Sequence, residues 1–140
     1  MADWDDVRGL ALALPQVVEV PSGTGALGWR VGRRPAFAWE RRMRPSELRG
    51  LADPPAGPVL GVRVADLEDK EALLAEHLRG VFTIDHFLGY PAVLVDLPAV
   101  PVDVLAELVV DAWLARAPVR LRKAYLAEQP QPPGGPAPAG

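Results

Sequence analysis

The sequence predicts an α+β fold, a two-layer sandwich in which an antiparallel sheet carries helices packed mainly on one face. Three observations support this prediction. Runs with strand-like alternation follow one another between residues 17 and 64, helical periodicity falls mainly in residues 3–14 and after residue 66, and hydrophobic residues make up 49% of the chain. Successive strands without a long intervening helix favour antiparallel pairing, and the hydrophobic content is enough for one core.

The first helix is predicted to begin after Asp3. Asp3 is a good N-cap, and Asp6 at the third helical position completes an acidic version of the capping box. Apolar residues follow at helical spacing until Pro15 ends the helix. The predicted apolar stripe consists of Trp4, Val7, Leu10, Ala11 and Leu14.

Three strands are predicted between residues 17 and 40, with a hairpin loop at 32–35. Alternation directs Trp29, Phe37 and Trp39 toward the core. The opposite face, extended by the next strand, is expected to hold small or charged residues: Gly28, Arg30, Ala36, Ala38, Glu40, Gly61 and Arg63. Such a face is either the solvated side of a half-buried sheet or a docking surface.

Helices and strands are both predicted in the rest of the chain. The expected elements are a basic connection at 41–51 with a helical turn at 45–48, a strand at 59–64, a helix from Asp66 to about His77, strands at 81–84 and 92–97, a helix at 102–116 and a last helix beginning at Pro118. The clearest helical stripe is Leu105, Leu108, Val109, Ala112 and Trp113. From Gln129 onward only Pro, Gly, Ala and Gln occur, so we expect one domain over 1–127 and a disordered tail over 128–140.

The composition limits the classes of protein to which the chain can belong. The chain has no cysteine, which removes disulfides, thiolate metal ligands and a cysteine nucleophile and suits a reducing compartment. The first residues are acidic where a secretory signal would be basic and then apolar. No apolar run approaches the ~18 residues of a membrane span. We therefore expect a cytoplasmic protein without membrane contact, and we favour a monomer.

The basic residues are concentrated in one segment. The net charge of the chain is −3, but residues 30–49 hold seven arginines against two glutamates, a local charge of +5 that leaves −8 on the rest. Arginine binds phosphate bidentately and releases counterions from DNA. Arg33 and Arg34 would project at the tip of the predicted hairpin. A second basic cluster near the C-terminus contains Arg116, Arg120, Arg122 and Lys123.

No pattern indicates catalysis, a metal or a cofactor. His86 follows Asp85, a carboxylate that could orient an imidazole, but adjacent turn residues often diverge and no nucleophile accompanies the pair. We expect a structural role for His86. Asp103, Glu107 and Asp111 recur every four residues on one predicted helix face. A metal would need further ligands converging from elsewhere, so we expect a solvated face there.

Several short motifs occur in order along the chain: Trp4-Asp5-Asp6-Val7-Arg8, Ala36-Phe37-Ala38-Trp39-Glu40-Arg41, Gly61-Val62-Arg63-Val64, Phe82-Thr83-Ile84-Asp85-His86-Phe87 before Gly89-Tyr90-Pro91-Ala92-Val93, and Ala112-Trp113-Leu114. Together they resemble the MmcQ/YjbR family over roughly residues 3–127. The resemblance implies an α/β sandwich similar to CyaY-like and secretion-chaperone-like folds. It also implies the usual label of that family, DNA-binding protein, which rests on likeness to a double-wing architecture. It implies no catalytic residues.

The residues and the resemblance together predict a non-enzymatic domain that binds DNA weakly, with salt-sensitive and largely sequence-independent affinity. The expected phosphate contacts are Arg30, Arg33, Arg34, Arg41, Arg42, Arg44 and Arg63. A protein-interaction or chaperone-like module that uses the exposed sheet face is the alternative class, and an enzyme is the third.

Overall fold

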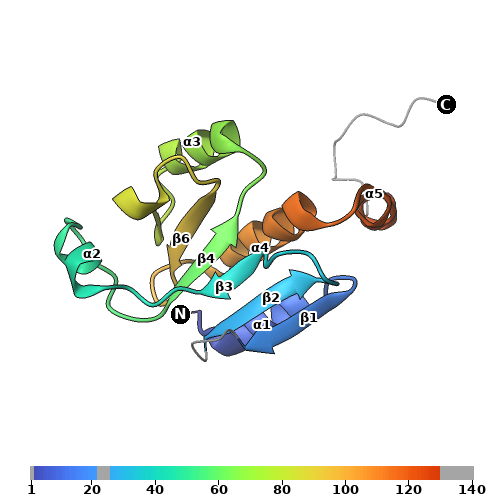
Figure 1. The fold of residues 1–140 in the computed structure, drawn as a ribbon, viewed down its shortest axis with the longest axis horizontal. Helices are drawn as coiled ribbons and strands as arrows, with labels where there is room; N and C mark the ends of the chain where they lie inside the picture. Colours follow the sequence, from blue (N-terminus) through green and yellow to red (C-terminus); the bar gives the residue numbers. More distant parts are fainter. Residues whose placement is uncertain (1, 22–25, 130–140) are drawn as a thin grey trace.

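A computed structural model describes residues 2–21 and 26–129 (Figure 1). The described elements are α1 (Trp4–Leu12), β1 (Val17–Pro21), β2 (Leu27–Val31), β3 (Ala38–Glu40), α2 (Pro45–Arg49), β4 (Val59–Arg63), α3 (Leu67–Ala75), β5 (Val81–Phe82), the 3₁₀ helix η1 (Asp85–Phe87), β6 (Ala92–Asp96), α4 (Val102–Arg116) and α5 (Val119–Glu128). The tail predicted at 128–140 lies, from residue 130 on, outside the described residues.

The described strands form one antiparallel sheet in the order β1-β2-β3-β4-β6-β5. Helices α1 and α4 pack against one face of it, as Figure 1 shows. Helices α3 and α5 add apolar side chains to the same core through Leu73, Leu74, Leu121 and Tyr125. The predicted α+β two-layer sandwich, with helices packed mainly on one face, is therefore confirmed.

Local signals define the two best-predicted helices. The Asp3 carboxylate accepts from the Asp6 backbone N–H at 3.0 Å, and the Asp6 carboxylate accepts from the Asp3 N–H at 2.9 Å, so the predicted capping box forms. In α4 the predicted stripe is the buried set. Trp113 at its end is fully buried, and its indole N–H donates to the Pro15 carbonyl at 3.1 Å, which joins the ends of α1 and α4.

The register of β3 differs from the prediction. Phe37 and Ala38 both pack into the main core, although they are consecutive. Trp39, expected in that core, lies on the opposite face, where it pairs with Gly28 and Gly61 on the neighbouring strands. Phe37 lies just before the regular strand, which begins at Ala38. The alternation of inward and outward side chains in β3 is therefore shifted by one residue from the prediction.

The sheet face opposite the main core is not bare along β4 and β6. A second apolar cluster covers it, formed by Val59, Ile84, Phe87, Ala92 and Leu94 with Trp39, Met43, Leu51 and Phe82 packed against them. These residues come from the sheet, from the segment around α2 and from the region of η1. The prediction that this face holds small or charged residues is therefore wrong where the second apolar cluster covers it. Among the helices of the described ranges, none is long and apolar enough to cross a membrane.

Candidate nucleic-acid interface

The turn between β2 and β3 carries Arg33 and Arg34 at the tip of a hairpin. Gly32 has a φ of +54°, which favours glycine, and its N–H donates to the Gln16 carbonyl at 3.0 Å. The Arg34 N–H donates to the Val31 carbonyl at 3.0 Å and closes the turn. Both arginines are exposed. The prediction of a hairpin loop with two arginines at its tip is confirmed.

Arg30 and Arg63 lie on the sheet face opposite the main core, at the hairpin end of their strands. They follow Gly28 and Gly61 by two positions, and both glycines pair with Trp39. Because side chains two positions apart in a strand point to the same face, both arginines share the Trp39 face. Both are partly buried, and the Nε of Arg30 is buried without a hydrogen-bond partner among residues 2–21 and 26–129.

Arg116, the last residue of α4, lies close to Arg63 and Arg34. Burial, and then the nearby charges of Arg63 and Arg34, hold the pKa of Arg116 below its ordinary value. Tyr90 acts in the opposite direction, through its charge and a side-chain hydrogen bond. The Arg63 guanidinium lies 5.7 Å from the centroid of the Tyr90 ring, a cation–π contact. Tyr90 therefore interacts with both arginines.

These residues form what we call the hairpin arginine cluster: Arg30, Arg33, Arg34, Arg63 and Arg116. Among the ion pairs within the described part of the chain, none joins a member of the cluster to a carboxylate. Positive charges gathered without a counter-charge repel one another and raise the local potential. In the folded domain this repulsion acts on Arg116, from Arg63 and Arg34.

Arg41, also a predicted contact, has a structural partner instead. Its Nη2 donates to Glu47 at 2.8 Å, and its guanidinium lies 5.6 Å from the Phe87 ring centroid. Only 16% of the Arg41 side chain is exposed. Although burial opposes it, the Arg44 backbone N–H and the Arg41 guanidinium hold the pKa of Glu47 below its ordinary value. Arg41 therefore ties α2 to η1 and has little surface left for a ligand.

The other arginines of the basic segment lie near α2. Arg42 is exposed, and its Nε lies 3.7 Å from a Glu40 carboxylate oxygen. Arg44 and Arg49 are exposed at the two ends of α2. Figure 1 shows α2 at one end of the domain, whereas the C-terminal end of α4, beside the hairpin tip, lies toward the other. The seven predicted contacts therefore do not form one continuous basic edge.

The remaining candidates for chemistry are His86 beside Asp85 and the acidic residues of α4. His86 lies exposed in η1, with its ring centroid 6.0 Å from that of Phe87. No hydrogen bond within the described residues joins His86 to Asp85. The described ranges also contain no group of three or more His, Asp or Glu side chains that could hold a metal ion.

The chain is similar to three mycobacterial proteins. These are the uncharacterized proteins Rv2570 and MT2646 of Mycobacterium tuberculosis and Mb2600 of Mycobacterium bovis, each 44% identical over 131 residues that cover 91% of this chain and 98% of the relative. The chain belongs to the family of these mycobacterial proteins. No family model matches it, and no solved structure matches it.

In this member of the mycobacterial family, the packing of α4 gives the hairpin arginines a neighbour that the sequence alone does not indicate. Arg116, predicted in a C-terminal basic cluster with Arg120, Arg122 and Lys123, lies beside Arg63 and Arg34. Arg116 is the last residue of the apolar helix α4. Only the packing of that helix across the sheet brings it to the hairpin.

Proposed function

We propose that the chain is a non-enzymatic DNA-binding domain that grips the phosphate backbone with the hairpin arginine cluster. Arg33 and Arg34 enter from the exposed tip, and Arg30, Arg63 and Arg116 supply a positive surface beside it. Contacts of this kind fix the position of a duplex without reading its sequence. The expected binding is weak, salt-sensitive and largely independent of base sequence.

The proposal rests mainly on one observation, that this cluster has no carboxylate partner among the described residues. Within the described residues, the salt bridges of the arginines involve Arg8, Arg41 and Arg42, not the five cluster members. Because like charges destabilise one another, an uncompensated group of arginines is more readily explained by an anionic ligand than by a stabilising role.

Two further observations support a DNA backbone as that ligand. The resemblance to the MmcQ/YjbR family implies a DNA-binding label and a double-wing architecture. The hairpin tip also projects its two arginines from a closed turn, which limits the conformational entropy lost on binding. Because the net charge of the chain is −3, only this local surface can attract DNA electrostatically. Salt screens such exposed charges, so it should weaken the binding strongly.

The direct test is the affinity for a labelled duplex in dilute salt, measured by fluorescence anisotropy for three proteins. These are the native chain, the variant Arg33→Ala/Arg34→Ala and the charge-matched control Arg49→Ala/Arg79→Ala, whose residues are exposed and lie outside the hairpin arginine cluster. Two unrelated duplexes of equal length should bind the native chain with similar affinity.

We expect the hairpin variant to lose about tenfold or more in affinity, since a charge-assisted contact contributes about 1.5–3 kcal/mol. The control should stay within about threefold of the native chain, because nonspecific charge loss is screened. Absence of binding by the native chain would exclude the proposed function. An equal loss in both variants would place the interface elsewhere.

A further inference from the structure

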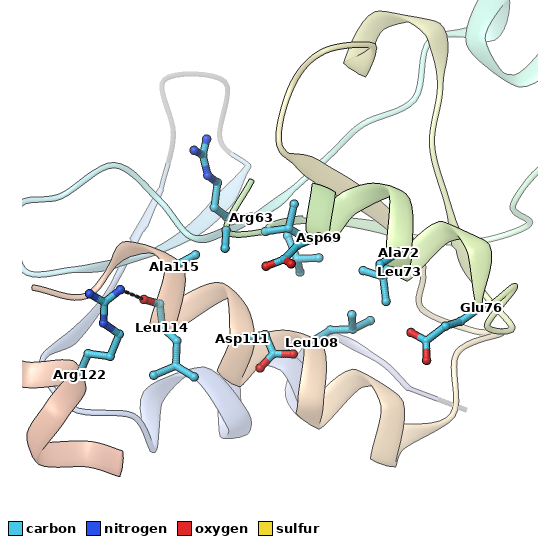
Figure 2. Close-up of a pocket in the computed structure, with 13 residues that line it drawn as sticks. Arg63, Asp69, Ala72, Leu73, Glu76, Leu108, Asp111, Leu114, Ala115 and Arg122 are labelled. Carbon is cyan, nitrogen blue, oxygen red and sulfur yellow. Dashed lines mark hydrogen bonds between the residues drawn. The ribbon is translucent and has the colours of Figure 1, made fainter. Parts of the chain in front are cut away.

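A groove of about 450 Å³ lies between α3 and α4, over the end of β4. Figure 2 shows the two helices as its walls. Its lining is largely apolar, with Val62 from β4, Val64 just after that strand, Leu73 from α3, and Leu108 and Leu114 from α4. Its volume lies within the range of roughly 300–1,000 Å³ that is typical of small-molecule sites.

Three carboxylates border this apolar groove from both walls. Asp69 and Glu76 come from α3, and Asp111 comes from α4. All three are exposed. The partial loss of solvent around the Asp111 carboxyl, and then the charges of Glu107 and Asp69, raise the pKa of Asp111 above its ordinary value. Within the described residues, none of the three bordering carboxylates forms an ion pair with a cation.

The two arginines that line the groove both lie toward one end of it. In Figure 2, Arg63 and Arg122 are at that end, Glu76 is at the other, and Asp69 and Asp111 lie between them. Arg122 is directed to the backbone, because its Nη1 donates to the Leu114 carbonyl at 3.3 Å. Arg63 is held over the Tyr90 ring. The stretch from Asp111 to Glu76 therefore keeps an unbalanced negative charge over an apolar floor.

We propose that this groove binds a linear aliphatic polyamine, with its methylene segments on the apolar floor and its ammonium groups beside Asp69, Asp111 and Glu76. Charge complementarity selects a cation, and the apolar floor between the carboxylates selects one whose charges are separated by hydrocarbon. A compact divalent ion fits less well, because the described residues offer no group of three ligands that could coordinate it. The two arginines exclude ammonium groups from their end of the groove.

The test uses spermidine as the probe, titrated into the full chain by isothermal calorimetry in buffer of fixed low ionic strength. Butylamine supplies one ammonium group with a short alkyl chain, and Mg²⁺ supplies charge without hydrocarbon. The site variant is Asp69→Asn/Asp111→Asn. The matched control is Glu68→Gln/Glu71→Gln, which removes two negative charges from exposed residues of α3 that do not line the groove.

We expect spermidine to bind at least about tenfold more tightly than butylamine or Mg²⁺, because it alone supplies several ammonium groups joined by hydrocarbon. The site variant should weaken spermidine binding about tenfold or more, and the control by less than about threefold. Spermidine that binds no better than Mg²⁺ would overturn the proposal, and so would a site variant that binds as well as the native chain.

A second measurement keeps the test decisive if the site variant does not fold. Backbone amide shifts of the native chain, followed by NMR during the spermidine titration, should move at Ala72, Leu73 and Leu108 in the groove walls. Shifts confined to other acidic surfaces, such as the residues around Asp53, would overturn the assignment. Because the readout is the amine itself, a failure of DNA binding would leave this result unaffected.

Discussion

The indole of Trp39 lies directly over the Cα of Gly61 on the neighbouring strand. The two residues are paired between β3 and β4. A Cβ placed on Gly61 would lie 2.5 Å from Cε2 of Trp39, closer than real carbon atoms approach. The missing side chain at Gly61 therefore provides the space that lets Trp39 cover the second face of the sheet.

Replacing Gly61 with alanine should destabilise the fold, because the methyl group must displace the Trp39 ring. We expect Gly61→Ala to lower the free energy of unfolding by about 1–3 kcal/mol, the usual cost of overpacking. Gly9→Ala is the control, since a Cβ at this α1 position meets no atom within 4 Å. It should stabilise by about 0.5–1 kcal/mol. Chemical denaturation measures both, and an unchanged stability for Gly61→Ala would contradict the packing described.

Lys70 holds the segment between η1 and β6 from the neighbouring helix α3. It is buried, with its Nζ donating to the carbonyls of Phe87 at 2.6 Å and Tyr90 at 2.8 Å. Lys70→Met keeps the aliphatic stem but leaves both carbonyls without this donor, so we expect a loss of about 1–3 kcal/mol. Faster amide hydrogen exchange at Leu88 and Tyr90 should accompany it. The exposed control Lys123→Met should change neither quantity.

Glu19 should make stability depend on pH in the acid range. Its Oε1 accepts from the Arg8 guanidinium at 2.8 Å and from the buried Trp29 indole N–H at 2.9 Å. The hydrogen bond from Arg8 is the main cause that holds the pKa of Glu19 below 4.5. A depressed folded-state pKa stabilises the protein above the unfolded value, and this stability is lost as the pH falls through the folded value.

Glu19→Gln retains a hydrogen-bond acceptor but removes the charge. At neutral pH this variant should therefore melt at a lower temperature than the native chain. The difference should shrink as the pH falls below the ordinary value of 4.5, and it should vanish once the pH has passed through the lower folded-state pKa of Glu19. Melting curves followed by circular dichroism measure this gap, and a gap that is constant with pH would show that the ion pair has no role in stability.

A substitution at Arg41 should show whether this arginine has a structural role or a ligand-binding role. Because it pairs with Glu47 and lies over Phe87, Arg41→Met should lower the free energy of unfolding by about 1–3 kcal/mol. Affinity for a duplex, measured by anisotropy below the melting temperature, should stay within about threefold of the native value. A large loss of affinity for the duplex with unchanged stability would show that Arg41 contacts DNA.

The parts of the fold that depend on local sequence could be predicted. The capping box at Asp3 and Asp6 and the buried stripe of α4 follow from hydrogen bonds and spacing within one helix. The position of Trp39 could not be predicted, because its ring lies where Gly61 leaves space on a different strand. Alternation alone also placed Ala38 outward, although it packs into the main core beside Phe37.

The same distinction applies to the candidate site. The hairpin tip with Arg33 and Arg34 follows from a glycine turn between two strand patterns, and the structure has it there. The placement of Arg116 depends on how α4 crosses the sheet, and the role of Arg41 depends on Phe87, which is distant in sequence. A charge count along the chain therefore located basic residues without distinguishing structural arginines from those left without a carboxylate.

Phosphate binding by the hairpin arginine cluster should be visible in the salt dependence of duplex binding. The logarithm of the binding constant should fall linearly with the logarithm of salt concentration between about 50 and 200 mM. Arg33→Ala/Arg34→Ala should make this slope shallower by about 2, because each lost phosphate contact lowers it by about 1. A native slope near zero, or a slope that the double substitution leaves unchanged, would contradict phosphate binding by the hairpin arginine cluster.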